Sequence, residues 1–160
     1  MNSRLFSSPV VQKALAEGNV RKLNAFLGFE YAIRGIVVPG NHLGRTLGFP
    51  TANLSLLSDN PPLLSNGVYA VKILVHDTLF NGMANIGVRP TINGKNLSIE
   101  VHLFDFNEDI YDQTLIVYFV ERIRNEIKFT RLEELGHQLQ VDKLHAIKLL
   151  GGRGHTDSNP

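Results

Sequence analysis

Two short runs, VYAVKILV (68–75) and LFNGMANIGV (79–88), decide the fold class of this chain. In the first run Tyr69, Val71 and Ile73 alternate with their neighbours, which is the two-residue period of a strand that buries one face. The few residues between the runs predict a β-hairpin. The sequence therefore indicates antiparallel β-structure at the centre of the chain.

Three further β-rich runs are separated by clusters of Gly, Pro and Asn: 31–39, 97–106 and 114–122. In the middle one, Ile99, Val101 and Leu103 share one face, which places Glu100 on the other face. No helix long enough for a parallel crossover lies between the runs, so we expect a mainly antiparallel sheet. Five or six short strands with one long loop (54–66) favour a small barrel or a Greek-key sheet.

Helices are expected before the β-region. Ser8 with Pro9 is typical of a helix start, and Gly18 is a suitable end for that helix. Asn19 then caps a second short helix, which Gly28 ends. The first 28 residues therefore form a helical extension.

A third helix is expected after the β-region. Thr130 and Glu133 form a capping-box pattern, and leucines follow at roughly helical spacing. Such a helix would close one end or side of the barrel. The tail 151–160 is polar and rich in glycine, so we expect it to be disordered.

Composition limits the class of protein. A chain of 160 residues with 43% hydrophobic and 19% charged residues is typical of one soluble globular domain. The net charge of +1 gives no electrostatic footprint for nucleic acid or for an anionic membrane. The absence of cysteine excludes disulfides and thiolate metal sites, and it suits a reducing cytoplasm. The N-terminus has no long apolar run, so we expect neither a signal peptide nor a membrane span.

The stretch GRTLGFPTAN, which begins at Gly44, is a candidate phosphate and metal site. Glycines at this position and at Gly48 let backbone N–H groups approach a ligand, and Arg45 adds a positive charge. Thr51 and Asn53 point to the same side of an extended segment and offer hard oxygen ligands for Mg²⁺ held with nucleotide phosphates. Composition alone favours the alternative of an ordinary loop, since the stretch matches neither a Walker A loop nor a dinucleotide fingerprint.

Two other groups leave alternatives open, whereas the histidines give a definite prediction. Glu100 lies mid-strand, either as an exposed charge or as a carboxylate that accepts a proton from a substrate hydroxyl. The NIGVRPT stretch (85–91), taken alone, indicates a strand end and a plain loop. Of the six histidines, His137 and His145 lie on the C-terminal helix more than two turns apart, so we predict no zinc site.

Five stretches together resemble the riboflavin kinase family, including the kinase module of bacterial bifunctional riboflavin kinase/FAD synthetases. In chain order they are GIVVPGNHLGRTLGFPTANL (35–54), GVYAVKI (67–73), MANIGVRPT (83–91), IEVHLFDFNEDIYD (99–112) and FVERIRNEIKF (119–129). The resemblance implies a six-stranded antiparallel Greek-key barrel with a C-terminal helix over 29–150. Residues 1–28 would be the remnant of a preceding nucleotidylyltransferase module.

The resemblance also implies a reaction, the transfer of the γ-phosphate of ATP to the ribityl 5′-hydroxyl of riboflavin to give FMN. Glu100 would be the general base, and Thr51 and Asn53 would ligate Mg²⁺ and contact ATP. Further ATP contacts are implied for Gly40, Gly44, Arg45, Gly48, Leu103, Asp105 and Tyr111. The flavin would lie against Arg124, Ile127 and Phe129, in a loop that closes over it. Neither zinc nor haem is expected.

The chain departs from the family pattern at two places. Asp112 stands where the family usually has Gly, and Asp tolerates a positive φ better than most residues. The N-terminal segment resembles only the end of the nucleotidylyltransferase half. We therefore expect no FAD synthesis from this chain alone, with an N-terminal FMN adenylyltransferase module as a partner missing from it.

Two other functions stay open beside the kinase. One is a non-catalytic flavin-binding or nucleotide-binding barrel, and the other is a small barrel that binds nucleic acid. The near-neutral charge counts against nucleic-acid binding. The resemblance implies ATP and riboflavin as the partners, and we expect neither nucleic acid nor a membrane as a partner. The expected location is the cytoplasm.

Overall fold

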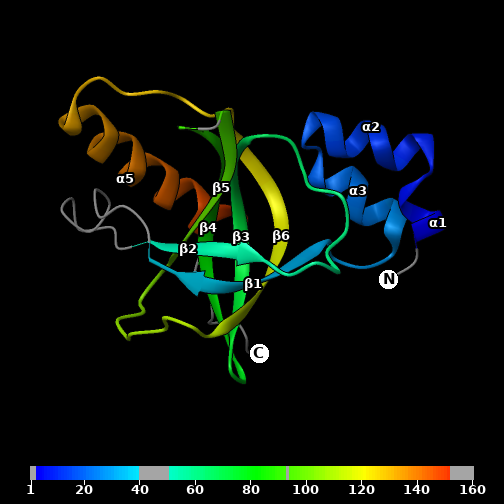
Figure 1. Cartoon of the computed structure of the whole chain (residues 1–160), viewed down its shortest axis with the longest axis horizontal. Coiled ribbons are helices and arrows are strands. Elements are labelled where there is room, and N and C mark those ends of the chain that lie inside the picture. Colours follow the sequence, from blue (N-terminus) through cyan, green and yellow to red (C-terminus); the bar gives the residue numbers. More distant parts are fainter. Residues whose placement is uncertain (1–2, 40–50, 93, 152–160) are drawn as a thin grey trace.

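The computed structural model describes residues 3–39, 51–92 and 94–151, and the chain folds into a closed barrel (Figure 1). Its strands are β1 (Ala32–Val38), β2 (Ala52–Leu56), β3 (Gly67–Val75), β4 (Thr78–Thr91), β5 (Gly94–Leu103) and β6 (Thr114–Arg124). The order around the barrel is β1-β2-β5-β4-β3-β6, and every pairing is antiparallel. Because β6 returns beside β3 after the β3–β4–β5 meander, the connection is a Greek key. The predicted fold class is confirmed.

The structure corrects two strand boundaries. Residues 54–56 belong to β2 and not to the predicted loop, since their main chain pairs with β1. Strand β4 continues to Thr91, so the end of the NIGVRPT stretch beyond the predicted run 79–88 is strand and not loop; its register with β5 is unbroken from Gly82 to Thr91. In both places the pairing with a neighbouring strand decides the strand boundary, and in the second it outweighs the turn preference of Pro and Gly.

Alternating apolar residues fill the interior of the barrel. Tyr69, Val71 and Ile73 of the predicted hairpin have no exposed side-chain surface. The hairpin turn follows Val75, which pairs with Thr78. Strands β4 and β5 approach so closely at Gly82 that a Cβ there would meet the main-chain oxygen of the facing strand, so only glycine fits.

Helices α1 (Ser3–Phe6), α2 (Pro9–Glu17) and α3 (Val20–Leu27) lie together on one side of the barrel (Figure 1). The predicted helix ends are confirmed, because Gly18 and Gly28 adopt the left-handed conformation with φ 69° and 82°. The Asn19 side chain accepts a hydrogen bond of 3.1 Å from the N–H group three residues on. Buried residues of these helices, such as Leu23, belong to the same hydrophobic core as the barrel interior.

Helix α5 (Leu132–Leu149) packs on the outer face of β3, β4 and β6, as expected for a helix that closes one side of the barrel (Figure 1). The small core between them consists of Ala70, Met83, Phe104, Ala146 and Leu150. The predicted N-cap is wrong, because the N-cap is Arg131 and not Thr130. The buried residues of the helix are Asp142 and Ala146.

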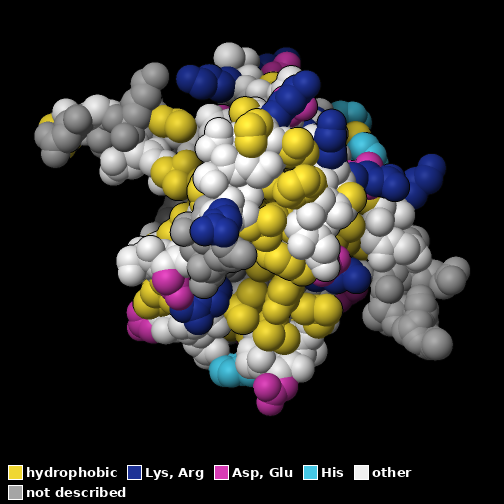
Figure 2. Space-filling model, turned by 90° about the vertical axis from the view of Figure 1, so that its right-hand side faces the viewer, with side chains coloured by type: hydrophobic (Ala, Val, Ile, Leu, Met, Phe, Trp, Pro, Cys, Tyr) yellow, Lys and Arg dark blue, Asp and Glu magenta, His cyan; other side chains and the backbone are white. Residues whose placement is uncertain are grey.

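No helix of the described residues covers another outer face of the barrel. Leu74, Ile116 and Tyr118 are half-buried and alternate with core residues, so they lie on the outside of β3 and β6. Figure 2 shows hydrophobic side chains gathered on one face of the molecule, with Lys and Arg beside them. Thr51, Glu100 and Arg124, which the sequence analysis names as site residues, lie instead on the side that α5 covers.

Candidate functional site

Three polar residues on adjacent strands form a row across the outer face of the barrel. Asn53 of β2 and Asn85 of β4 each lie directly opposite Glu100 of β5. Directly opposed residues have Cβ atoms about 4.5–5.5 Å apart and point to the same face. We call Asn53, Glu100 and Asn85 the polar row. Their chain neighbours, Ile99 and Val101 among them, point into the core, so the row faces outward.

The register extends this row toward α5. Asn85 pairs with Val68 of β3, and Val68 pairs with Arg124 at the end of β6. Five strands thus contribute one residue each to a continuous band across the sheet. The band places Glu100 in its middle and Arg124 at its far end, although the two are distant in the sequence.

Two cavities border the band, and Thr51 lines both of them. The larger cavity has a volume of about 470 Å³ and is lined by Val37, Thr51, Ala52, Leu103 and residues 106–111. The smaller cavity has a volume of about 140 Å³. Apolar residues of β3 and β4, the β6–α5 loop and α5 line it together with the polar side chains of Thr51, Asn85, Glu100, His102, Arg124 and Asp142. Thr51 therefore lies where a molecule in one cavity could meet a molecule in the other.

The polar row has two buried amide atoms without a hydrogen-bond partner among the described residues. These atoms are Nδ2 of Asn53 and Oδ1 of Asn85. Nearly all buried polar groups in proteins are hydrogen-bonded, and exceptions often mark places where a ligand or water binds. The row is thus incomplete as a purely structural feature, on both sides of Glu100.

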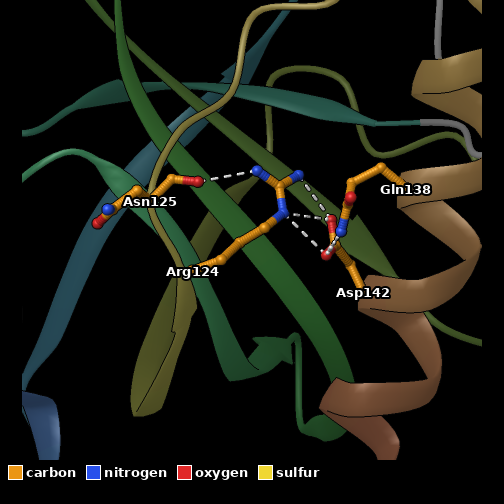
Figure 3. A network of polar contacts seen from close by, with 4 residues as sticks. All are labelled: Arg124, Asn125, Gln138 and Asp142. Atoms are coloured by element: carbon orange, nitrogen blue, oxygen red, sulfur yellow. Dashed lines mark hydrogen bonds and ion pairs between the residues drawn. The ribbon is translucent and has the colours of Figure 1, made fainter.

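Arg124 is held by helix α5 (Figure 3). Its Nε lies 2.9 Å from Oδ1 of Asp142 and its Nη2 lies 2.7 Å from Oδ2, so the pair is bidentate. Gln138 donates a further hydrogen bond to this carboxylate, over 2.9 Å. Asp142 is only 1% exposed, and a buried carboxylate needs such charged and polar partners. The network fixes α5 against the end of β6 at the edge of the smaller cavity.

The loop between β6 and α5 (125–131) begins at Asn125, which accepts two hydrogen bonds. The main-chain oxygen of Asn125 accepts a hydrogen bond of 2.9 Å from Arg124, and its side-chain oxygen accepts one of 2.7 Å from Arg122. Beyond this point Ile127 is 46% exposed, while Phe129 is half-buried. Both line the smaller cavity. The loop therefore starts at a hydrogen-bonded residue and carries two apolar side chains, Ile127 and Phe129, beside the cavity.

The structure brings most of the expected site residues to these two cavities. Thr51, Glu100, Arg124, Ile127 and Phe129 line the smaller one. Leu103 and Tyr111 line the larger one, together with Thr51. Asn53 joins them through its pairing with Glu100.

The remaining expected residues are placed differently. Asp105 is exposed with φ 56°, and it lines neither cavity. Gly40, Gly44, Arg45 and Gly48 lie outside the described residues, as does the tail 152–160. Asp112 adopts φ 67°, the left-handed conformation that its replacement of a family Gly suggested.

The sequence analysis did not single out Gln138 and Asp142, and it gave Asn85 of the NIGVRPT stretch no specific role. A signal for Asp142 was available, because it follows Leu139 by three positions and precedes Ala146 by four, on the apolar face of its helix. A charge on such a face predicts a buried partner. For Asn85 the sequence indicated a position at a strand end but no partner, since the pairing with Glu100 is not visible in a local pattern.

Thr51 and Asn53 fit a hard divalent cation in their chemistry. A threonine hydroxyl and an asparagine carbonyl are the neutral oxygen ligands that Mg²⁺ accepts, with phosphate oxygens and water completing its coordination. Thr51 borders both cavities, and the buried Nδ2 of Asn53 is a donor without a partner among the described residues, which suits a phosphate oxygen beside the metal. The residues present are therefore compatible with a metal–nucleotide complex at this point.

The family model described as Flavokinase, riboflavin kinase, matches residues 27–150, which include every strand of the barrel and α5. The chain belongs to the riboflavin kinase family. The bifunctional riboflavin kinase/FMN adenylyltransferase of Haemophilus influenzae is 46% identical over 143 residues, which cover 89% of this chain and 46% of that protein. This chain thus spans about half the length of the curated relatives that it matches.

Two solved structures share the fold of this riboflavin kinase domain. A crystal structure of a protein named macrolide-efflux protein from Streptococcus pneumoniae is 40% identical, with a TM-score of 0.80 over 86% of this chain and 45% of that one. The riboflavin kinase from Trypanosoma brucei is 22% identical, with a TM-score of 0.51 over 74% of this chain and 78% of that one. This second likeness concerns the fold alone. Within the described residues, no helix is long and apolar enough to cross a membrane.

Proposed function

We propose that this chain transfers the γ-phosphate of ATP to the ribityl 5′-hydroxyl of riboflavin and so forms FMN. One observation carries the proposal: two cavities of different character meet at Thr51, beside the polar row. Phosphoryl transfer needs a donor and an acceptor in line with each other, and it depends mainly on positioning and charge neutralisation. Membership of the riboflavin kinase family supports the choice of substrates.

The nucleotide is assigned to the larger cavity and the flavin to the smaller one. Leu103 and Tyr111 offer an apolar and an aromatic surface to the nucleotide. Ile127 and Phe129 suit the flat isoalloxazine ring, and Arg124 can lie along its edge or face. A volume of about 140 Å³ is below the roughly 300–1,000 Å³ of typical ligand pockets, so the loop 125–131 must move to admit the flavin.

Glu100 is assigned the role of general base. It lies on the cavity wall one strand from Asn53, so a hydroxyl near it faces the place where the two cavities meet. The carboxylate accepts the proton as the hydroxyl oxygen bonds to the γ-phosphorus, the bond from this phosphorus to the bridging oxygen breaks, and ADP leaves with that electron pair. A positioned carboxylate contributes about 10²–10⁴-fold in such a step. Mg²⁺, held by Thr51, Asn53 and the phosphates, would neutralise charge that develops on the phosphoryl oxygens.

The direct test is incubation of the purified chain with riboflavin, ATP and Mg²⁺, with FMN separated by chromatography. We expect FMN to accumulate in proportion to ADP. Absence of FMN with any divalent metal would remove the kinase assignment. Flavin binding without turnover would then favour the alternative of a non-catalytic flavin-binding barrel.

We further propose that FMN is the end product of this chain alone, and that the cytoplasm is its location. The matching family model is that of the kinase, and adenylyl transfer to FMN would need a second site. The curated relatives are named as bifunctional proteins, so an FMN adenylyltransferase module is the natural partner for the product. Detection of FAD in the same chromatograms would contradict the first of these proposals.

A further inference from the structure

Asn85 is the member of the polar row that the proposed chemistry leaves unused. It lines the smaller cavity and lies directly opposite Glu100 in the β4–β5 register. Its Oδ1 is buried and has no hydrogen-bond partner among the described residues. A buried acceptor without a partner costs stability, so its presence is better explained by a bound group than by the fold.

We propose that Oδ1 of Asn85 accepts a hydrogen bond from a secondary hydroxyl of the ribityl chain and thereby positions the 5′-hydroxyl at Glu100. This inference rests on the proposed function, because it assumes that riboflavin occupies the smaller cavity. The amide oxygen is an acceptor only, and each ribityl hydroxyl can donate. The two groups are therefore complementary.

The register gives the direction of the ribityl chain. Asn53, Glu100 and Asn85 follow one another across β2, β5 and β4, and neighbouring strands are about 4.8 Å apart. The side of the row at Asn53 is where the two cavities meet, and the smaller cavity extends from Asn85 toward Arg124 and the loop 125–131. A flavin ring against that loop, with its 5′-hydroxyl at Glu100, must lead its polyol chain past Asn85.

The role assigned to Asn85 is one of substrate selection as well as positioning. A site built to bond a substrate hydroxyl discriminates strongly against an analogue that lacks it, because the protein acceptor is then left unpaired. An apolar residue at this place would accept a flavin with a shortened or deoxygenated side chain equally well. Asn85 therefore selects flavins that carry the polyol.

The substitution Asn85→Leu tests this, because leucine has the same branching as asparagine but no polar atoms. The measured quantity is the Kd for riboflavin, from quenching of flavin fluorescence in the presence of ADP and Mg²⁺. We expect riboflavin binding to weaken about tenfold, the value of one hydrogen bond of ordinary strength. The thermal unfolding midpoint should stay level or rise, since a buried unpaired acceptor has been removed. If Asn85 had a merely structural role, its substitution would lower the unfolding midpoint and weaken riboflavin binding together.

Deoxy analogues identify the hydroxyl. The wild-type chain should bind one of 2′-, 3′- and 4′-deoxyriboflavin about tenfold more weakly than riboflavin, and Asn85→Leu should bind that analogue and riboflavin alike. Equal losses on all three analogues in both proteins, or unchanged riboflavin binding by the variant, would overturn the inference. The second result would mean that a water satisfies Oδ1. Asn85→Ala provides the same comparison if the leucine variant does not fold.

The binding measurements separate this inference from the proposed function. If the wild-type chain binds riboflavin but forms no FMN, the kinase proposal fails, and the analogue comparison still decides the role of Asn85. If FMN forms and the variant binds every flavin like the wild type, only the inference fails. If riboflavin does not bind at all, both fall.

Discussion

Two sets of polar side chains on the barrel differ in how completely they are hydrogen-bonded. Under the N-terminal helices, Asn24 uses both ends of its amide: Nδ2 donates to the Phe119 carbonyl over 2.9 Å, and Oδ1 accepts from the Tyr31 N–H over 2.8 Å. Under α5, Asn53 and Asn85 each have a buried amide atom without a partner among the described residues. The same residue type thus serves two purposes in one domain.

The satisfied set extends through aromatic and charged residues. The Tyr31 hydroxyl donates to the Pro62 carbonyl over 2.7 Å, and the Tyr69 hydroxyl donates to the Ser65 carbonyl over 2.6 Å. Arg122 in turn contacts the Tyr69 oxygen at 2.6 Å and lies over its ring. Such a closed network ties the helices and the long β2–β3 connection to the barrel. The comparison teaches that saturation of hydrogen bonds separates structural polar residues from candidate binding residues here.

The largest expected effect is on turnover and concerns Glu100, the middle residue of the polar row. Glu100→Gln keeps the shape of the side chain but removes the carboxylate base, so kcat for FMN formation should fall about 10²–10⁴-fold. The unfolding midpoint should change little. Glu30→Gln, at an exposed position outside both cavities, is the matched control and should retain full activity. A fall in kcat of less than about tenfold for Glu100→Gln would remove it as the base.

The next effect is on stability, at the link between the site and α5. Asp142→Ala leaves the guanidinium of Arg124 without its bidentate partner, and breaking such a buried pair costs about 3–5 kcal/mol of unfolding free energy. Urea unfolding measures it. Asp59→Ala breaks the exposed Arg34–Asp59 pair as a control and should cost about 0–1 kcal/mol. Similar losses in the two variants would show that the buried network does not hold the helix.

A smaller effect on stability is expected in the satisfied set. Asn24→Ala leaves the Tyr31 N–H and the Phe119 carbonyl without this partner, at a cost of about 1–3 kcal/mol for an unsatisfied buried group. Activity per folded molecule should persist. Asn85→Leu is the contrasting variant, with unchanged or higher stability and weaker flavin binding. If both variants lost stability equally, hydrogen-bond saturation would not distinguish the two sets.

Removal of the proposed metal ligand should change the metal requirement more than the fold. Asn53→Ala should raise the Mg²⁺ concentration for half-maximal FMN formation several-fold, because one oxygen ligand is lost. A titration of activity with Mg²⁺ at saturating ATP measures this. An unaltered half-maximal concentration would place Asn53 outside the metal site.

The smallest effect is a pH dependence of stability in the satisfied set. Burial raises the pKa of Tyr31 and of Tyr69 above the ordinary tyrosine value near 10, although hydrogen bonds partly oppose the shift. The unfolded chain then releases these protons first, so the unfolding free energy should be level below pH 10 and fall above it. Tyr69→Phe should make the fall between pH 9 and pH 11 shallower in chemical unfolding curves. An equally steep fall in this variant would exclude Tyr69 as a source.

Local patterns in the sequence predicted those parts of the fold that local interactions determine. The alternation of Tyr69, Val71 and Ile73 gave a strand, and Gly18 and Asn19 marked helix ends, because period and capping need only near neighbours. The extension of β4 to Thr91 was not predictable in this way. It depends on pairing with β5, whose position relative to β4 a local pattern does not contain.

The candidate site was predictable as a set of residues but not as an arrangement. Motif resemblance named Thr51, Glu100 and Arg124, which lie on or beside three different strands. Only the barrel register places them along one band, and only α5 completes the wall with Asp142. Asn85 was given no specific role for the same reason. Its significance comes from its missing partner, which is a property of the packed structure.

The central claim is that substrates complete the unsatisfied polar row and leave the satisfied network unchanged. Two-dimensional ¹H–¹⁵N NMR of the side-chain amides tests it directly, with riboflavin, ADP and Mg²⁺ added to the labelled chain. We predict that the amide resonances of Asn53 and Asn85 shift on binding, while those of Asn24 stay in place. Bound flavin with unshifted Asn53 and Asn85 resonances would contradict the claim.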